Sequence, residues 1–231
     1  MGTIVEAKLL QRKRTVALAR WLLGKHLVRR FADGRVEARM IVETEAYDGE
    51  HDLACHARFG RTARTEVMYA AGGVWYVYLC YGIHEMLNLV VGPEGWPAAV
   101  LIRGFEGASG PGRVTKALAI DRKLNGREAT AEIAGLWIED RGVRVSRTRV
   151  NATPRVGVNY AGPVWAKKPW RFIFSPPTSA PPHPAPPRPK SRRASARIWA
   201  RARVASVAPT WRDRSDRKEE HLACRTPRPG D

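Results

Sequence analysis

Apolar and polar positions in the N-terminal three quarters of the chain follow short periods that predict a mixed domain. A helical spacing of apolar residues follows Thr15, a suitable N-cap, and predicts a helix over residues 16–25. Residues 36–43 alternate between apolar and polar side chains and predict a half-buried strand. A hairpin turn at Asp33-Gly34 joins this strand to a shorter one over residues 27–31.

Further short runs rich in β-branched and aromatic residues predict more strands, and one glycine-rich turn predicts a second helix. The expected strands cover residues 74–81, 86–91, 98–103, 135–139 and 170–174, and the helix covers residues 110–120. Short hairpin spacings outnumber long crossovers, which favours antiparallel pairing. We therefore predict an α+β fold over residues 1–174, a single mixed domain with a curved, largely antiparallel sheet flanked by helices.

The composition of the chain changes sharply after Phe174. From Ser175 onward the sequence contains 11 of the 17 prolines, with 13 basic and 5 acidic residues. Proline at this density removes backbone donors and blocks helices, so residues 175–231 are predicted to form a disordered basic tail. Three interpretations of the tail stay open: a solvated ending, an arm that binds phosphates and raises DNA affinity, and a GC-rich gene read out of frame.

The net charge favours a polyanionic partner. Lysine and arginine number 40 against 22 acidic residues, which gives a formal charge of +18 and a pI near 10.7. Nucleic acid or an anionic membrane surface would fit this charge, but the apolar runs are too short and too often interrupted to span a bilayer. The three cysteines form neither a disulfide framework nor a zinc cluster, and no secretory segment begins the chain, so we expect a cytoplasmic protein.

Two acidic side chains end the alternating strand and are the first candidates for chemistry. Glu43 and Glu45 fall on one face because strand side chains alternate, so one could be a buried base and the other its salt-bridged neighbour. The following loop carries Tyr47, His56 and several acidic residues that could bind a metal. Their spacing is not that of a calcium loop, and no CxxC or HExxH motif exists, so a metal site is the weaker option.

The aromatic run after Gly72-Gly73 supplies a second group of candidates. Tyr76 and Tyr78 share one face of the expected strand, and aromatic residues at this density are typical of a core. Tyr81 differs, because it lies beside Gly82 at a hairpin bend, where an aromatic ring on a basic protein could act as a wedge between base pairs.

Four polar residues farther along the chain are candidate ligand contacts. Asn88 lies in an apolar strand and must be hydrogen-bonded, either to the local backbone or to the edge of a ligand. Arg103 ends a predicted strand and suits a phosphate or a carboxylate. Arg113 and Lys116 lie near a predicted helix N-terminus, which is either an anion site or a simple cap.

Seven segments, in order along the chain, resemble the alkyladenine (3-methyladenine) DNA glycosylase family. They are ETEAY (Glu43–Tyr47), ACH (Ala54–His56), RTEVM (Arg64–Met68), YVYLCYGIHEMLN (Tyr76–Asn88), AVLIRG (Ala99–Gly104), GPGRVTKAL (Gly110–Leu118) and RVGVNYAG (Arg155–Gly162). The resemblance covers roughly residues 16 to 174. It implies a monofunctional base-excision repair enzyme with no metal or redox cofactor, which acts as a monomer on double-stranded DNA containing damaged purines and, in a bacterium, lies at the nucleoid.

The resemblance also implies roles for the matched residues. Glu45 would be the general base that activates the water attacking the deoxyribose C1′. Tyr81 would fill the space left by the extruded nucleotide, and Tyr47, His56 and Tyr78 would hold the flipped base.

The two remaining matched residues would tune the site. Asn88 would crowd the amino group of guanine, and Arg103 would lie near the reactive water and the DNA backbone. We expect Arg103 to keep the pKa of Glu45 low enough for ionisation near neutral pH. No lysine falls in the matched pocket positions, so lyase chemistry is not expected. The alternatives are a basic DNA- or RNA-binding protein that retains the fold without catalysis, and a nucleic-acid-coating protein driven by the tail.

Overall fold

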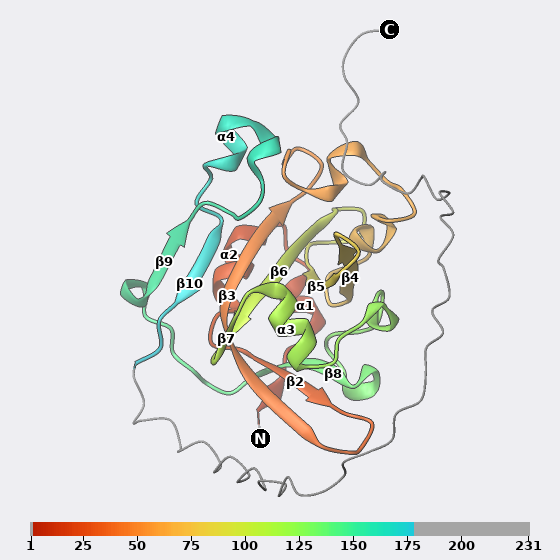
Figure 1. Ribbon diagram of the computed structural model, residues 1–231, viewed down its shortest axis with the longest axis vertical. Coiled ribbons are helices and arrows are strands. Elements are labelled where there is room, and N and C mark those ends of the chain that lie inside the picture. The colour runs from red at the N-terminus through yellow and green to blue at the C-terminus, as the bar shows by residue number, and fades with distance from the viewer. Residues whose placement is uncertain (1, 178–231) are drawn as a thin grey trace, which may run out of the picture. The chain divides into compact units, whose positions relative to one another are not determined.

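The computed structural model of this protein describes residues 2–177 (Figure 1). The predicted tail from residue 178 onward lies outside the described residues. Within the described part, strands predominate, every strand pairing is antiparallel and the helices are short. The predicted α+β class with a largely antiparallel sheet is therefore confirmed.

The elements of the described residues are as follows. The α-helices are α1 (Ala7–Leu10), α2 (Thr15–Trp21), α3 (Pro111–Ala117) and α4 (Gly162–Ala166). The strands are β1 (Thr3–Ile4), β2 (His26–Arg30), β3 (Val36–Asp48), β4 (Trp75–Cys80), β5 (His84–Val90), β6 (Ala98–Phe105), β7 (Ala108–Ser109), β8 (Leu136–Asp140), β9 (Val150–Thr153) and β10 (Arg171–Phe174).

Strand β3 organises the sheet, whose order is β1-β8-β2-β3-β6-β5-β4. The first half of β3 pairs with β2, and its second half lies between β6 and β10, with β9 beyond β10 (Figure 1). Residues 43–45 of β3 are thus flanked by a strand on each side, β6 and β10.

Two register shifts interrupt the pairing of β3 with β6. Glu43 pairs with Gly104 and Thr44 with Ile102, so Arg103 is an extra residue on β6. A β-bulge of this kind bends the strand and redirects one side chain. Arg103 therefore lies inside a strand that continues to Phe105, and the prediction that it ends a strand is wrong.

One face of the sheet packs on the main apolar core. Its large side chains come from β4, β5, β6 and β10, and α2 and α3 pack against it. Thr44 joins this face to α2, because its hydroxyl donates a hydrogen bond to the Ala19 carbonyl oxygen at 2.8 Å. The predicted site lies on the opposite face of the sheet, over strands β3, β6, β5 and β4.

Two local predictions need correction. The helix predicted over residues 16–25 is α2, which begins at Thr15 and ends at Trp21, and the Thr15 hydroxyl donates to Asp48 instead of capping the helix. In β3 the predicted alternation is not kept, since Val36 is exposed, Ile41 is fully buried, and Met40 and Val42 are only partly buried. Both faces of the sheet are covered from residue 43 to residue 46, so burial does not alternate there.

Candidate active site

The strand register aligns five residues in one row across the sheet. Tyr76 pairs with Asn88, Asn88 with Leu101, Leu101 with Glu45 and Glu45 with Arg171. Directly opposed residues of antiparallel strands point to the same face. The row therefore brings the predicted base Glu45, the predicted pocket amide Asn88 and Tyr76 of the aromatic strand onto the face opposite the main core.

Glu45 lies at the centre of this face with both oxygens hydrogen-bonded. Its Oε1 accepts from the Val156 backbone N–H at 2.8 Å and lies 3.5 Å from Arg103 Nη1, and its Oε2 accepts from the Tyr47 hydroxyl at 2.8 Å. The side chain is 0% exposed. Burial raises the pKa of Glu45, with Arg103, the Val156 N–H and the Tyr47 hydroxyl opposing the shift. Arg103 therefore lowers the pKa of Glu45 as expected, but burial outweighs it and the net shift is upward.

Glu43 lies beside Glu45 and holds the neighbouring cations. Its Oε1 accepts from Arg103 Nε at 3.0 Å and from Arg171 Nε at 2.7 Å, and its Oε2 accepts from the Ser109 hydroxyl at 3.1 Å. These hydrogen bonds lower the pKa of Glu43 against the opposing effect of burial, which is the largest single cause. The predicted division into a buried carboxylate and a salt-bridged neighbour matches this geometry.

Three aromatic rings pack together on the same face. The His56 and Tyr78 rings contact at 4.6 Å between centroids, and Tyr76 lies 5.2 Å from Tyr78. His56 Nδ1 lies 3.0 Å from the Tyr76 hydroxyl. Burial, aided by the nearby charges of Arg64 and Arg58, lowers the pKa of His56 to about 4, so the imidazole is neutral near pH 7.

Asn88 is hydrogen-bonded to the local backbone, which is one of the two alternatives predicted for it. Its Nδ2 donates to the Tyr76 carbonyl oxygen at 3.1 Å and to the Met86 carbonyl oxygen at 3.2 Å, so the amide is satisfied by the local backbone. The side chain is buried and remains in the row with Glu45.

Residues 49–70 form a covering segment over this face and include two 3₁₀ turns, η1 (His56–Phe59) and η2 (Glu66–Tyr69). Its acidic side chains already have protein partners: Asp52 pairs with Arg155, and Glu50 accepts from the Tyr69 hydroxyl. Within residues 2–177, no group of three or more histidine, cysteine or acidic side chains is placed to hold a metal ion.

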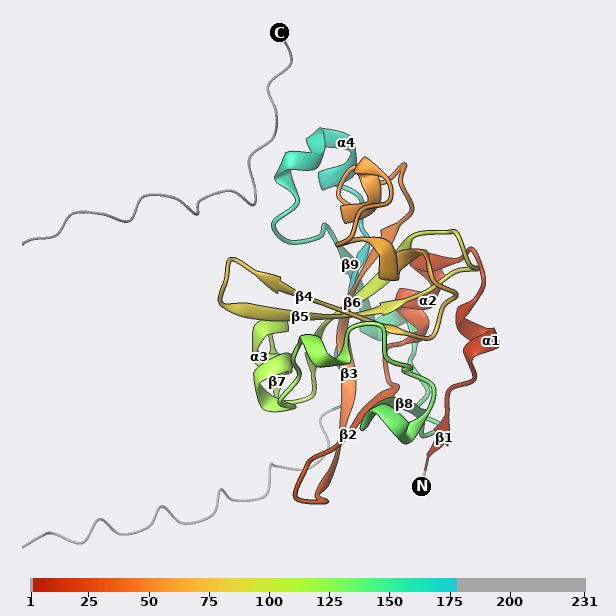
Figure 2. The ribbon, with the colours of Figure 1, turned by 90° about the vertical axis from the view of Figure 1, so that its right-hand side faces the viewer.

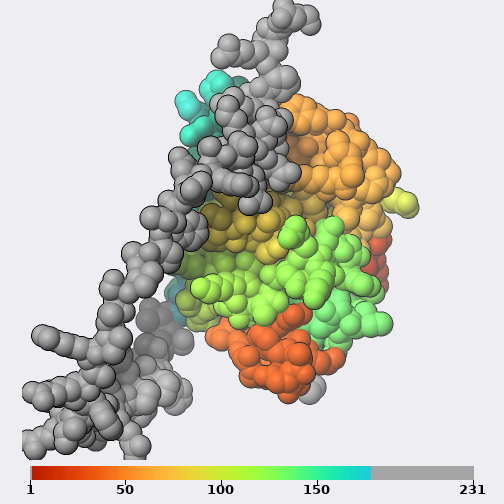
Figure 3. Space-filling view, turned by 45° about the vertical axis from the view of Figure 1, so that its right-hand side comes forward, coloured from red at the N-terminus to blue at the C-terminus, as the bar shows by residue number. Residues whose placement is uncertain are grey.

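Tyr81 lies at the tip of the β4–β5 hairpin, which projects from the body of the domain (Figure 2). The ring is 83% exposed, and both Tyr81 and Gly82 have positive φ, as a type I′ turn requires. A tyrosine in this left-handed region is strained by about 1 kcal/mol or more. The covering segment, the hairpin and α3 adjoin on one surface, in orange, dark yellow and yellow-green (Figure 3).

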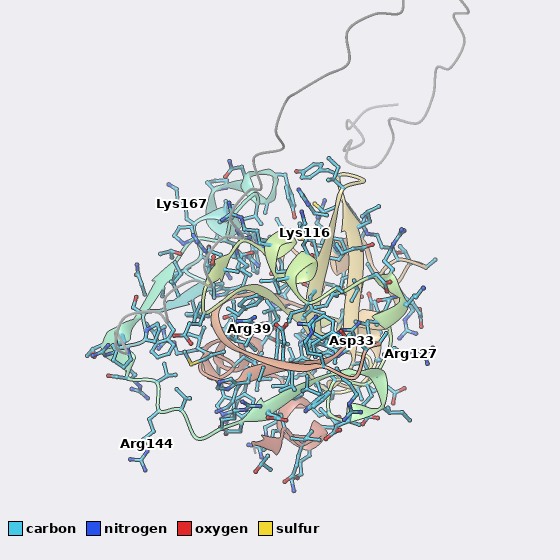
Figure 4. The ribbon with its side chains drawn as sticks, turned by 60° about the horizontal axis from the view of Figure 1, so that its bottom comes forward. Asp33, Arg39, Lys116, Arg127, Arg144 and Lys167 are labelled. Carbon is cyan, nitrogen blue, oxygen red and sulfur yellow. The ribbon has the colours of Figure 1, made fainter. Side chains whose placement is uncertain are left out.

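Arg113 and Lys116 are exposed on α3, which packs against β5. Among the described residues neither side chain has an ion-pair partner. Lys116, together with Lys167 at the end of α4, lies toward the hairpin side in Figure 4. With seven residues, α3 is too short for a strong terminal dipole, so these cations act through their own charges.

Several residues of the site have no role in the sequence-based prediction. Arg155 and Val156 belong to the matched segment RVGVNYAG but lie more than 100 residues from the strand they contact. Asp52 is one of the acidic residues of the loop after Tyr47, for which the sequence suggests only a weak metal site, and Tyr76 is predicted only as a core aromatic. The segment match was the available signal for Arg155, Val156 and Tyr76, and nothing in the sequence singled out Asp52.

Neither of two cavities elsewhere on the domain includes a predicted site residue. One, of about 430 Å³, is lined by Arg149 and its neighbours, and the other, of about 270 Å³, lies beside Trp21. No helix within residues 2–177 is both long enough and apolar enough to cross a membrane.

Comparison with known proteins identifies the family. The profile of the methylpurine-DNA glycosylase family matches residues 9–109 and 106–177. A protein of Methanocella arvoryzae, assigned by name as a 3-methyladenine DNA glycosylase, is 48% identical over 178 residues, which cover 68% of this chain and 86% of the relative.

Two bacterial relatives with the same assigned name agree. That of Anaeromyxobacter sp. strain Fw109-5 is 49% identical over 166 residues, covering 68% of this chain and 82% of its own. That of Herpetosiphon aurantiacus is 40% identical over 194 residues, covering 75% and 86%. The predicted resemblance is confirmed: the chain belongs to the methylpurine-DNA glycosylase family and is a DNA-repair glycosylase that processes alkylated bases.

Proposed function

We propose that this protein hydrolyses the N-glycosidic bond of alkylated or otherwise damaged purines in double-stranded DNA and leaves an abasic site. Glu45 acts as the general base, and the damaged nucleotide is extruded from the duplex to reach it. The observation that carries this proposal is the juxtaposition of one buried carboxylate with Tyr47, Tyr78 and His56 on a single face of the sheet.

Base extrusion is needed because a stacked base exposes neither C1′ nor its full edge. Tyr81 is suited to the space that the base leaves, since its exposed ring stands at the tip of a projecting hairpin. Exposed Arg113 and Lys116 would bind the flanking phosphates. Lesions that weaken pairing lower the cost of extrusion and are favoured for this reason.

The ring contacts limit where the base enters. His56 and Tyr78 touch, so no aromatic base fits between them. The base would instead stack on the outer surface that the His56 and Tyr78 rings form together. Tyr47 would lie between the base and Glu45. A base alkylated at a ring nitrogen is cationic and interacts favourably with electron-rich tyrosine faces. A neutral His56 avoids repulsion with such a base.

The attacking water must reach Glu45 past Tyr47, whose hydroxyl covers Oε2. We therefore expect the Tyr47 ring to shift as the base enters, which frees Oε2 to accept a proton from water. Arg103 would stabilise the carboxylate and lie near the DNA backbone, and Asn88 would crowd the guanine amino group. With a water nucleophile and no amine in the proposed mechanism, we expect no lyase step.

Product analysis tests the proposal. Duplexes that each contain one 3-methyladenine, 7-methylguanine, hypoxanthine or ethenoadenine should release the free base, and the DNA strand should break only after alkaline treatment. Glu45→Gln should bind lesion DNA without release. A protein that binds DNA but releases no base would support the non-catalytic alternative, and strand breakage without alkali would contradict the expected monofunctional chemistry.

A further inference from the structure

We infer that the buried Arg155–Asp52 ion pair is a positioning device for the general base, holding the Val156 N–H against Glu45 and the His56 loop against the sheet. The inference rests on the proposed role of Glu45. It concerns two residues that touch neither DNA nor the reacting atoms, because both side chains are fully buried.

The Arg155 guanidinium makes a fork-like contact with Asp52. Its Nη1 lies 2.5 Å from Asp52 Oδ2, and its Nη2 lies 2.9 Å from Oδ1. Such bidentate pairs fix orientation as well as distance. The guanidinium also lies over the Tyr47 ring, 4.9 Å from its centroid, so it packs beneath a proposed base-stacking residue.

Two further contacts join Arg155 to the strand that bears the base. Its Nη1 donates to the carbonyl oxygen of Ala46, the residue between Glu45 and Tyr47, at 2.8 Å. The next residue in the chain, Val156, donates its N–H to Glu45 Oε1 at 2.8 Å. A shift of the Arg155 backbone would therefore move a hydrogen-bond donor directly off the carboxylate.

Asp52 extends the same device to the covering segment. Its carboxylate accepts from the backbone N–H groups of Asp48 at 3.1 Å and Ala54 at 3.0 Å. Ala54 lies two residues before His56, so the pair fixes the loop that presents the imidazole. One ion pair thus connects β3, the His56 loop and the segment that contains Val156.

The orientation of the Arg155 guanidinium leaves one of its own donors without a hydrogen bond within residues 2–177. Arg155 Nε is a buried donor with no partner among the described residues, although Nη1 and Nη2 make four contacts. A buried donor left unsatisfied is rare and calls for an explanation. Here the orientation that lets Nη1 and Nη2 donate to Ala46 and Asp52 leaves Nε without an acceptor in the described part of the chain.

The test compares Arg155→Met and Arg155→Lys with wild type in single-turnover base release across pH. The charge of Arg155 also acts on Glu45, and Arg155→Lys keeps this charge whereas Arg155→Met removes it. The other charged or titratable groups that face Glu45 are Arg103, Arg171 and Tyr47, and all are kept in both variants. Lys25→Met is the matched control, because Lys25 is also buried in an ion pair, with Asp140 at 2.9 Å, away from the site.

Arg155→Met should lower the maximal rate of base release about 10- to 100-fold, because small displacements of catalytic groups have effects of this size. The acid limb of its rate profile should move up by about one pH unit, since Glu45 loses both a hydrogen bond and a nearby positive charge that favour the ionised form. Affinity for undamaged duplex DNA should stay within about twofold, because the buried Arg155 side chain does not reach the DNA-binding surface. Arg155→Lys should be intermediate, and Lys25→Met should keep both the rate and the limb.

A wild-type rate and acid limb in Arg155→Met would overturn the inference. Should that variant fail to fold, Arg155→Lys decides, since it keeps the buried charge: wild-type values there would overturn the inference equally. Glu45→Gln, measured in the same assay, separates failure of the proposed function from failure of the positioning role alone. If it releases base at the wild-type rate, the proposed function fails; if it is inactive while the Arg155 variants behave as wild type, only the positioning role fails.

Discussion

The two faces of the central sheet are buried to the same degree but differ in chemistry. Trp75 and Tyr76 are neighbours on β4 and are 0% and 2% exposed, yet Trp75 faces the apolar core and Tyr76 faces the site. Glu45 and Ala46 on β3 show the same contrast. Exposure alone therefore does not separate the structural face from the functional one; the hydrogen-bond pattern does.

The contrast has an energetic consequence. Apolar burial on the core face stabilises the fold directly, by about 25 cal/mol per Å². Buried charges on the site face cost free energy unless each is paired and hydrogen-bonded. Glu43, Glu45 and Asp52 meet that condition, through two to four contacts each. The site face therefore provides geometry and chemistry more than stability.

The largest expected effect is on the core face. Trp75→Ala should lower the free energy of unfolding by about 3–5 kcal/mol, since it leaves a cavity and removes the hydrogen bond from the indole to the Leu136 carbonyl. Tyr78→Phe on the site face should lower it by about 1 kcal/mol or less. Urea unfolding of both variants checks the comparison, which breaks if the tyrosine change is the more costly.

The second effect concerns the acid stability of the site face. The folded pKa of His56 lies near 4, below its ordinary value of 6.5, so its contribution is complete above pH 6.5 and is lost as pH falls toward 4. Across this range wild type should lose on the order of 3 kcal/mol more than His56→Gln, which cannot titrate. Melting temperatures of the two proteins at a series of pH values test this. Parallel curves would show that the imidazole is not held neutral.

A substitution at the hairpin tip should raise the stability of the protein but weaken its binding to lesion DNA. Tyr81→Asn should raise stability by about 1 kcal/mol, because asparagine tolerates positive φ better than tyrosine. The same change should weaken lesion binding by removing the ring. Ile133→Asn is the control, since Ile133 is also exposed but lies on another turn. Unchanged lesion affinity in Tyr81→Asn would argue against the wedge.

The smallest effect is expected from surface cations. Arg113→Ala or Lys116→Ala should weaken DNA binding a few-fold for damaged and undamaged duplexes alike, and should reduce the slope of log affinity against log salt by about 0.9. Arg144→Ala is the matched control, because its exposed side chain lies far from the hairpin (Figure 4). Equal slopes for all variants would remove α3 from the DNA-binding surface.

The periodic parts of the fold were predictable from the sequence. Strands β2, β4, β5, β6, β8 and β10 lie within one or two residues of the predicted ranges, because alternation and β-branched runs are local signals. Strands β1, β7 and β9 were missed. The first two have only two residues each, and β9 (VNAT) lacks the alternation of large apolar side chains that marks β10 (RFIF), a strand of the same length.

The candidate site was predictable in its residues but not in its connections. Segment matches indicated Glu45, Tyr47 and His56, and the structure brings Glu45 and Tyr47 into direct contact. The contact between Val156 and Glu45 spans 111 residues, and the bulge that redirects Arg103 depends on pairing between distant strands. The direction of the Glu45 pKa shift depends on burial, which no local pattern shows.

The most direct test of the account measures base release and thermal stability together in Glu45→Gln. The account predicts a loss of release of about 10³-fold or more, consistent with removal of a general base. It also predicts a melting temperature no lower than that of wild type, because a neutral amide replaces a buried carboxylate. Release within tenfold of wild type would contradict the assignment of Glu45 as the base.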